Sequence, residues 1–87
     1  MLEEMMGQKI VLDLRSEYVC LGTLAGVGDH FLELKNVDLH DLRDTDTTRE
    51  NYIAEAVITG IQRNRRRIWL NRNEVVAIAL LADVVNE

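Results

Sequence analysis

The segment that most constrains the fold runs from Arg65 to Leu81 and reads RRRIWLNRNEVVAIALL. Its first half alternates polar and apolar residues, and its second half is a nearly unbroken apolar run that begins at Val75. The polar residues from Asn71 to Glu74 separate the two halves. Short apolar runs rich in β-branched and aromatic residues, joined by turn-forming residues, are typical of two strands and not of one helix. We therefore predict a final strand pair here.

Three earlier segments also have the pattern of strands. Lys9 to Arg15 alternates, which predicts one face on the core and one wet face. Tyr18 to Val27 contains Gly22 and Gly26, and glycines in a strand mark bends or close backbone approach. Phe31 to Leu39 alternates again. The sequence therefore predicts three consecutive strands, the second of them curved, ahead of the final pair.

A longer helix is expected between the third and fourth strands, at about residues 47–63. Thr47 and Glu50 fit the capping-box pattern, with Thr47 as the N-cap residue. Gly60 and Asn64 are the expected ends. The apolar stripe of this helix consists of residues at i, i+4 and i+8: Ile53, Val57 and Ile61. A further turn of helix is predicted for residues 1–6, ahead of Gly7.

These elements predict a mainly β fold, a five-stranded, strongly bent antiparallel small barrel formed by a single domain, residues 1–87. A domain this small buries only about 60% of the surface that its unfolded chain exposes. Cys20 is the single cysteine, so no disulfide within the chain stabilises the fold, and we expect Cys20 to be buried as a small hydrophobe. Oligomerisation is the common alternative source of stability. The last strand would also leave an unpaired edge, which a second subunit can cover.

Two stretches resemble the signatures of the Sm and Sm-like family. Residues 14–24, LRSEYVCLGTL, are similar to the first signature, in which a strand, a tight turn and a strand with Gly-Thr-Leu follow one another. Residues 70–78, LNRNEVVAI, are similar to the second. The chain thus resembles a divergent Sm-like protein of bacterial or phage type. The resemblance implies an SH3-type barrel that closes into a homo-oligomeric ring and binds single-stranded RNA at its pore.

The resemblance also implies roles for individual residues. RNA contacts are expected in two loops, at Asp29, His30, Phe31, Asn71 and Arg72. Contacts between subunits are expected on the final strand pair, at Ile68, Trp69, Leu70, Val76, Ile78 and Leu80. The chain departs from the family pattern, because the turn at residues 28–32 has no Asn and Asn71-Arg72 stands in place of Arg-Gly. Nucleotide specificity is therefore not carried over.

Plainer interpretations stand beside these. Phe31 also fits a core or interface position, His30 a solvated turn, and Trp69 a packing anchor between subunits. The arginines between Arg63 and Arg67 also fit a role in solubilising an edge or in pairing with the acids of residues 38–46. The net charge of −5 argues against a sequence-blind nucleic-acid coat. The alternative function is a homo-oligomeric interaction or structural module that binds no nucleic acid.

No pattern predicts an enzyme, a cofactor or a small-molecule substrate. The sequence has no phosphate-binding glycine loop and no His pair at helical spacing for a metal. Asp38, His40 and Asp41 offer metal-ligand atoms in one acidic stretch, but without a fourth ligand they are expected to be solvated. Residues 1–6 lack the basic and apolar regions of a signal peptide, and no apolar run is long enough to span a membrane. We expect a soluble cytoplasmic protein.

Overall fold

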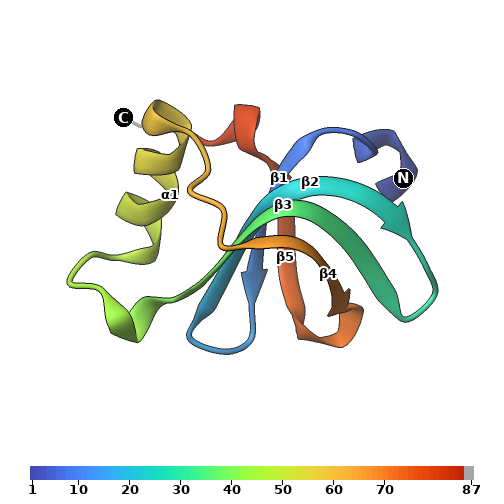
Figure 1. Ribbon diagram of the computed structural model, residues 1–87, viewed down its shortest axis with the longest axis horizontal. Helices are drawn as coiled ribbons and strands as arrows, with labels where there is room; N and C mark the ends of the chain where they lie inside the picture. Colours follow the sequence, from blue (N-terminus) through green and yellow to red (C-terminus); the bar gives the residue numbers. More distant parts are fainter. Residues whose placement is uncertain (86–87) are drawn as a thin grey trace.

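A computed structural model describes residues 1–85 as one strongly bent antiparallel sheet with a helix on its outer side (Figure 1). The strands are β1 (Lys9–Leu14), β2 (Tyr18–Val27), β3 (Phe31–Asp41), β4 (Arg65–Asn71) and β5 (Val75–Leu80). The helix α1 (Arg49–Thr59) lies between β3 and β4. The predicted mainly β fold, with five strands and an inserted helix, is confirmed.

The order of the strands in the sheet leaves two edges. It is β4-β3-β2-β1-β5, so consecutive strands pair except at the end of the chain, where β5 pairs with β1 instead of β4. Within residues 1–85, β4 and β5 each have one neighbouring strand, and the barrel is open between them. No helix among these residues is long and apolar enough to cross a membrane.

The sheet bends at Gly22, as the glycine pattern predicted. The register of β2 against β3 shifts between Leu21 and Thr23. A Cβ atom on Gly22 would lie 3.2 Å from the carbonyl oxygen of Lys35 and 3.2 Å from a methyl carbon of Val37. Contacts this short are tighter than nine in ten Cβ contacts, so a side chain at residue 22 would push β3 away, and glycine favours the close approach of the two strands.

An irregularity in β3 changes which residues face the core. Thr23 pairs with Lys35 and Leu21 pairs with Asp38, so β3 has one more residue than β2 in this interval. Asn36 takes up the difference with a left-handed φ of 52°. Because side chains alternate along a strand, one extra residue reverses the alternation beyond it. The alternation predicted from sequence therefore holds only up to Lys35.

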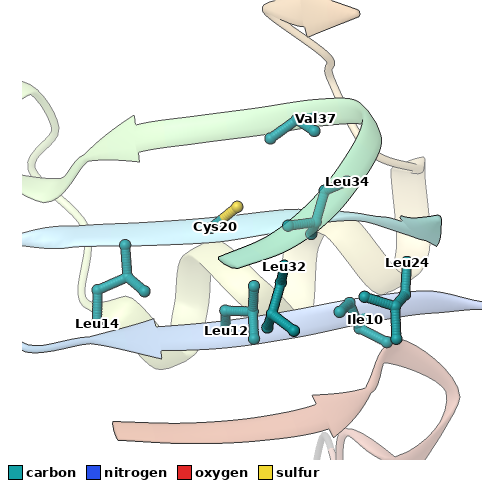
Figure 2. Close-up of a cluster of buried hydrophobic side chains, with 8 residues drawn as sticks. All are labelled: Ile10, Leu12, Leu14, Cys20, Leu24, Leu32, Leu34 and Val37. Atoms are coloured by element: carbon teal, nitrogen blue, oxygen red, sulfur yellow. The ribbon is translucent and has the colours of Figure 1, made fainter. Parts of the chain in front are cut away.

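The main core lies on the concave side of the bent sheet. Figure 2 shows side chains from β1, β2 and β3 pointing toward one another there. They are Ile10, Leu12, Leu14, Cys20, Leu24, Leu32, Leu34 and Val37. Cys20 is buried as predicted, and burial, with a smaller contribution from the charge of Asp38, raises the pKa of its thiol to about 12. The thiol is therefore neutral and acts as a small apolar group.

A second core lies on the other side of β1 and β2, beneath α1. It consists of Val11, Val19, Leu21, Ile53, Ala56 and Leu81. The prediction of a wet second face for β1 is therefore wrong at its centre, because Val11 is covered by the inserted helix. Asp13 on the same face forms an ion pair with Arg49, with 3.4 Å between its carboxylate oxygen and the guanidinium nitrogen. The chain thus has a two-sided sheet at β1 and β2.

Helix α1 is shorter than predicted and begins one residue later. Thr48, not Thr47, is the N-cap residue, and its hydroxyl accepts a hydrogen bond from the backbone N–H of Asn51 at 3.2 Å. Gly60 ends the helix with a φ of 91°, as expected from its residue type. Of the predicted apolar stripe, Ile53 is buried and Ile61 packs partly buried against the second core, but Val57 is 41% exposed. The buried face is centred on Ile53 and Ala56 because the helix packs on the sheet along an i, i+3 row.

Other boundaries differ by a few residues. The N-terminal turn at Leu2–Met5 is a 3-10 helix, and Gly7 follows it with a φ of 78°. Strand β3 continues past the predicted end, Leu39, to Asp41. Asn64 was expected to end the helix, but it instead lies beside β3, where its side chain accepts from the N–H of Leu39 and donates to the carbonyl of Leu39. This amide holds the return of the chain from α1 to the sheet.

Candidate nucleic-acid interface

Two turns that are distant in sequence meet where β3 begins and β4 ends. The β2–β3 turn, residues 28–31, lies against the β4–β5 turn, residues 71–74, which is a 3-10 turn. The backbone N–H of Arg72 donates to the carbonyl oxygen of His30 at 2.9 Å, and the Arg72 guanidinium donates to the carbonyl oxygen of Gly28 at 2.7 Å. Figure 1 shows both turns at the same end of the molecule, away from α1. The structure therefore brings together the two loops that the sequence singled out.

Phe31 is the first residue of β3 and is half exposed. Its side chain is 50% exposed, so it is not a core residue of the protomer. It borders a hollow of about 290 Å³ on the outer face of β2, β3 and β4. The hollow is lined by Gly26, Val27, Gly28, Phe31, Glu33 and Trp69. An aromatic face beside an open hollow is a surface on which a flat ring can stack.

Asp29 and His30 are exposed at the tip of the β2–β3 turn. The turn is closed by a hydrogen bond from the N–H of Gly28 to the carbonyl oxygen of Phe31 at 2.9 Å. Neither side chain makes a hydrogen bond or an ion pair within residues 1–85, so both point to solvent with their polar atoms free. Such groups can contact a ligand without first breaking a bond in the protein.

Asn71 and Arg72 are less free. The Asn71 side-chain oxygen accepts from the backbone N–H of Asn73 at 2.9 Å and so caps the 3-10 turn. Within residues 1–85, the Arg72 guanidinium makes one hydrogen bond, to the Gly28 carbonyl oxygen. Arg72 is otherwise exposed to solvent. Arginine carries five N–H donors. Its remaining donors can bind an anion while the first holds the turn, which makes Arg72 the strongest cationic group of the site.

A charged pair with an aromatic ring lies next to Phe31. Arg67 forms an ion pair with Glu33 at 2.6 Å, and its guanidinium lies 4.5 Å above the centre of the Trp69 ring. Trp69 is 60% exposed. Sequence reasoning missed this group, because it depends on the pairing of Glu33 with Trp69 across β3 and β4. The acids of residues 38–46 form no ion pair with the arginine cluster in the part of the chain described.

The other arginines of the cluster, Arg63, Arg65 and Arg66, lie at the other end of β4. Arg65 pairs with Val37, whereas Asn71 pairs with Phe31, so the length of β4 separates these three arginines from the two turns. Arg63 donates to the side-chain oxygen of Asn36 at 2.6 Å. Arg63, Arg65 and Arg66 therefore lie away from the turns, whereas Arg67 lies beside the hollow at Phe31 and Arg72 belongs to the turns.

The predicted subunit contacts fall into two classes. Four of these side chains are partly buried against the main core: Ile68, Leu70, Ile78 and Leu80. Trp69 and Val76 point outward, and Val76 is 67% exposed at an irregularity in the β1–β5 register. The partly buried set lies on the two edge strands and packs against the main core. Neither class has a partner that completes its burial within residues 1–85.

The expectation that the acidic stretch at residues 38–41 is solvated is wrong for Asp38, which is buried, and each of the three groups has another partner. Asp41 pairs with Arg43 at 2.8 Å, and the His40 ring stacks on Tyr52 with ring centres 4.0 Å apart. Asp38 accepts hydrogen bonds from Tyr52 and Asn64. Within residues 1–85 no group of three or more His, Cys, Asp or Glu side chains is arranged to hold a metal ion.

The sequence matches no protein-family model and no curated protein. Solved structures are similar. The Sm protein of Pyrococcus abyssii, in complex with a uridine heptamer, aligns with a TM-score of 0.61 at 14% identity over 90% of this chain and 89% of its own. The P. aerophilum Sm protein heptamer gives 0.60 at 18% identity over 91% and 85%. A chain of the NatC complex bound to CoA gives 0.61 at 16% identity over 92% and 83%.

These likenesses span nearly the whole length of both chains in each comparison. They establish that this chain has the Sm fold, as the resemblance of residues 14–24 and 70–78 predicted. The identities are too low to carry the function of any one of these proteins.

Proposed function

We propose, from the Sm fold of this chain, that it assembles head to tail into a homo-oligomeric ring and binds single-stranded RNA where the turns 28–31 and 71–74 meet. The observation that carries this proposal is the pair of hydrogen bonds from Arg72 to the carbonyl oxygens of Gly28 and His30. It fixes a cation and a half-exposed aromatic ring at one place. RNA-binding proteins read single strands with stacking surfaces and phosphate contacts of this kind.

The two sheet edges support the ring. Among residues 1–85, strands β4 and β5 are unpaired on one side and carry apolar residues, which makes an isolated protomer prone to pairing. The edges are different surfaces, so their contact is head to tail and closes into a ring when the rotation allows. Pairing β4 of one subunit with β5 of the next would complete the burial of the partly buried side chains on these strands, Ile68, Leu70, Ile78 and Leu80. The P. aerophilum Sm protein of the same fold is a heptamer.

The ring also explains how a small site can suffice. One subunit offers Arg72, Phe31 and the free groups of Asp29 and His30, and a ring repeats this set once per subunit. Linked sites raise the overall affinity without new contacts, because each later contact is intramolecular. The Pyrococcus abyssii Sm protein of this fold holds a uridine heptamer. A uridine-rich strand is therefore the first ligand to test.

A second candidate has one specific observation in its favour. The same fold aligns with a chain of the NatC complex, an assembly bound to CoA. The unpaired edges β4 and β5 of this chain would then serve an interaction module that pairs with itself or another protein and binds no nucleic acid. In both candidates the chain acts by binding, with no cofactor, and not as a catalyst.

Light scattering and fluorescence anisotropy test both parts of the proposal. We expect a mass of several times 10.0 kDa for the purified protein. Labelled uridine-rich and adenine-rich single strands should bind at low salt, with the logarithm of the affinity falling by about 0.7 per contacted phosphate for each unit of log salt concentration. Arg72→Glu should reduce binding at least tenfold and leave the oligomer intact. Arg72→Gln, which keeps hydrogen-bond donors, should lie between.

Arg63→Glu is the matched control for charge. It makes the same change at the far end of β4, where the Arg63 guanidinium donates to the side chain of Asn36, and it should bind RNA nearly as the wild type does. If Arg72→Glu and Arg63→Glu weaken binding equally, the effect is general electrostatics and the site at the turns is wrong. A wild-type oligomer that binds no short RNA at low salt supports the interaction module, and a monomer at micromolar concentration rejects the ring.

A further inference from the structure

A small cavity lies on the helix side of the molecule, between α1 and β3. Its volume is about 120 Å³, and it is lined by Asp38, Tyr52, Glu55, Ala56, Thr59, Gly60 and Gln62. A single water needs only about 10–15 Å³ of such space. The cavity therefore has room for a ligand of several heavy atoms but not for a nucleotide. Figure 1 shows α1 at the opposite side of the molecule from the two turns.

A buried carboxylate forms one wall of this cavity. Asp38 is 4% exposed and is the one buried charged side chain among residues 1–85. The bulge at Asn36 places it there, because the extra residue turns Asp38 away from the main core and toward α1. Its pairing partner, Leu21, belongs to the second core beneath the helix. The backbone of β3 thus places the Asp38 side chain on the helix side of the sheet, whichever rotamer the side chain adopts.

The groups that hold this carboxylate are neutral. The Tyr52 hydroxyl donates to one oxygen, and the Asn64 amide donates to the other at 3.3 Å. Burial, followed by the hydrogen bond to Asp38, raises the pKa of Tyr52 above its usual value, so its hydroxyl remains a donor. No Arg, Lys or His nitrogen lies within ion-pairing distance of Asp38 in the described chain. Two oxygens have about four acceptor positions, and only two of these are used.

An uncompensated buried charge is costly, and buried charges in proteins are usually paired. The other cavity walls fit a cation with a short apolar stem. Glu55 is exposed at the rim and adds a second negative charge, and Ala56 adds an apolar wall. Tyr52 also lines the cavity and keeps its hydroxyl on the carboxylate. The cavity is therefore complementary in charge and shape to a small amphipathic cation.

We propose that this cavity binds a small organic cation, an alkylammonium or alkylguanidinium group, whose charged end pairs with Asp38 and whose stem lies against Ala56. The ligand is either a free amine or the end of a basic side chain of another protein, since both present the same chemistry. The site lies beyond the RNA contact proposed above and does not depend on it, because the two are separated by residues 32–37 of β3.

NMR titration of the full-length protein tests this site. The probe is butylammonium chloride, with butanol as the neutral analogue and sodium chloride at equal ionic strength. We expect saturable shifts of the backbone amides of Thr59, Gly60 and Gln62 with butylammonium alone. Nα-acetyl-lysine N-methylamide distinguishes the sources. If this lysine analogue binds as tightly as butylammonium, the ligand is a basic side chain of another protein. If it binds more weakly, the ligand is a free amine.

Four variants define the roles of the two carboxylates. Asp38→Asn keeps the shape and removes the charge, and should weaken butylammonium binding at least tenfold. Glu55→Gln, at an exposed position, should weaken it a few-fold and keeps the test valid if Asp38→Asn does not fold. Thr59→Lys supplies a tethered ammonium at the rim, and should raise the melting temperature and abolish butylammonium binding, whereas Thr59→Gln should do neither.

The proposal is overturned by any of three results. Equal shifts with butylammonium and butanol would show that the cavity selects the stem and not the charge. Asp38→Asn and Glu55→Gln that both bind as the wild type does would show that neither carboxylate recognises the cation. An absence of saturable shifts at the cavity amides in the wild type would show that the cavity is not a cation site.

Discussion

The two ends of β3 are built in opposite ways. At the turn end, Phe31 is half exposed and Arg72 reaches across to hold carbonyl oxygens of the neighbouring turn. At the helix end, Asp38 is buried and is held by the side chains of Tyr52 and Asn64. At the turn end, hydrogen bonds hold the backbone and aromatic and polar side chains remain exposed. At the helix end, neutral side chains hold a buried carboxylate.

The difference shows where the fold can accept a ligand without rearrangement. A surface whose backbone is already bonded can contact a long flexible strand through its exposed groups. A buried carboxylate, in contrast, selects by size and charge, because only a small group reaches it. The bulge at Asn36 lies between these ends and separates them, since it reverses the alternation of β3. The following predictions test whether the two ends are independent.

The largest effect is expected from the core that both ends share. Leu34 is fully buried between them, and Leu34→Ala should reduce the free energy of unfolding by about 2–5 kcal/mol through lost burial and a cavity. Chemical denaturation followed by Trp69 fluorescence and by far-UV circular dichroism should give one common transition. Leu34→Met, which conserves volume, should cost less than about 1.5 kcal/mol. Two separate transitions would show that the ends unfold independently.

Tyr52→Phe should affect the helix end alone. It removes the hydroxyl that donates to the buried Asp38 carboxylate, and hydrogen bonds to charged groups contribute about 1.5–3 kcal/mol. Denaturation should show a loss of this size, with RNA affinity unchanged. Tyr18→Phe is the control, because the Tyr18 hydroxyl has no partner within residues 1–85, and it should change stability by less than about 0.5 kcal/mol. Equal losses in the two variants would contradict the role of the hydroxyl.

Phe31→Ala should affect the turn end alone. If a base stacks on this half-exposed ring, single-stranded RNA should bind more weakly by about 1–3 kcal/mol per stacked base. Fluorescence anisotropy measures the loss, and the melting temperature should change little. Ile58→Ala removes an exposed apolar side chain on α1 and should leave the affinity unchanged. An unaltered affinity in Phe31→Ala would remove Phe31 from the RNA site.

The smallest effect concerns the start of α1. Thr48→Ala should reduce stability by about 1 kcal/mol, because its hydroxyl caps the helix at the N–H of Asn51. Thr47→Ala, one residue earlier, should stay within about 0.5 kcal/mol of the wild type. Thermal denaturation of the two variants compares them directly. The reverse order would restore the boundary that the sequence favoured.

The sequence determined the strands and the bends because those signals are local. Alternation in Lys9–Leu14 and Arg65–Asn71, the absence of a side chain at Gly22 and the motif at residues 70–78 each depend on neighbours along the chain. Together they predicted the element order, the bent sheet and the Sm fold. That residues 28–31 and 71–74 would lie together was implied only by the resemblance to the Sm-like family.

The tertiary structure alone decided which side chains those elements bring together. A bulge is a property of pairing between strands, so the alternation of β3 gave no sign that Asn36 would reverse it and bury Asp38 beneath α1. The pairing of Arg67 with Glu33 depends on the β3–β4 register across the inserted helix. Thr47 and Thr48 are chemically equal as caps, and packing of Ile53 and Ala56 on the sheet fixed which one starts the helix. Local chemistry sets the elements, but contacts between residues far apart in sequence set the sites.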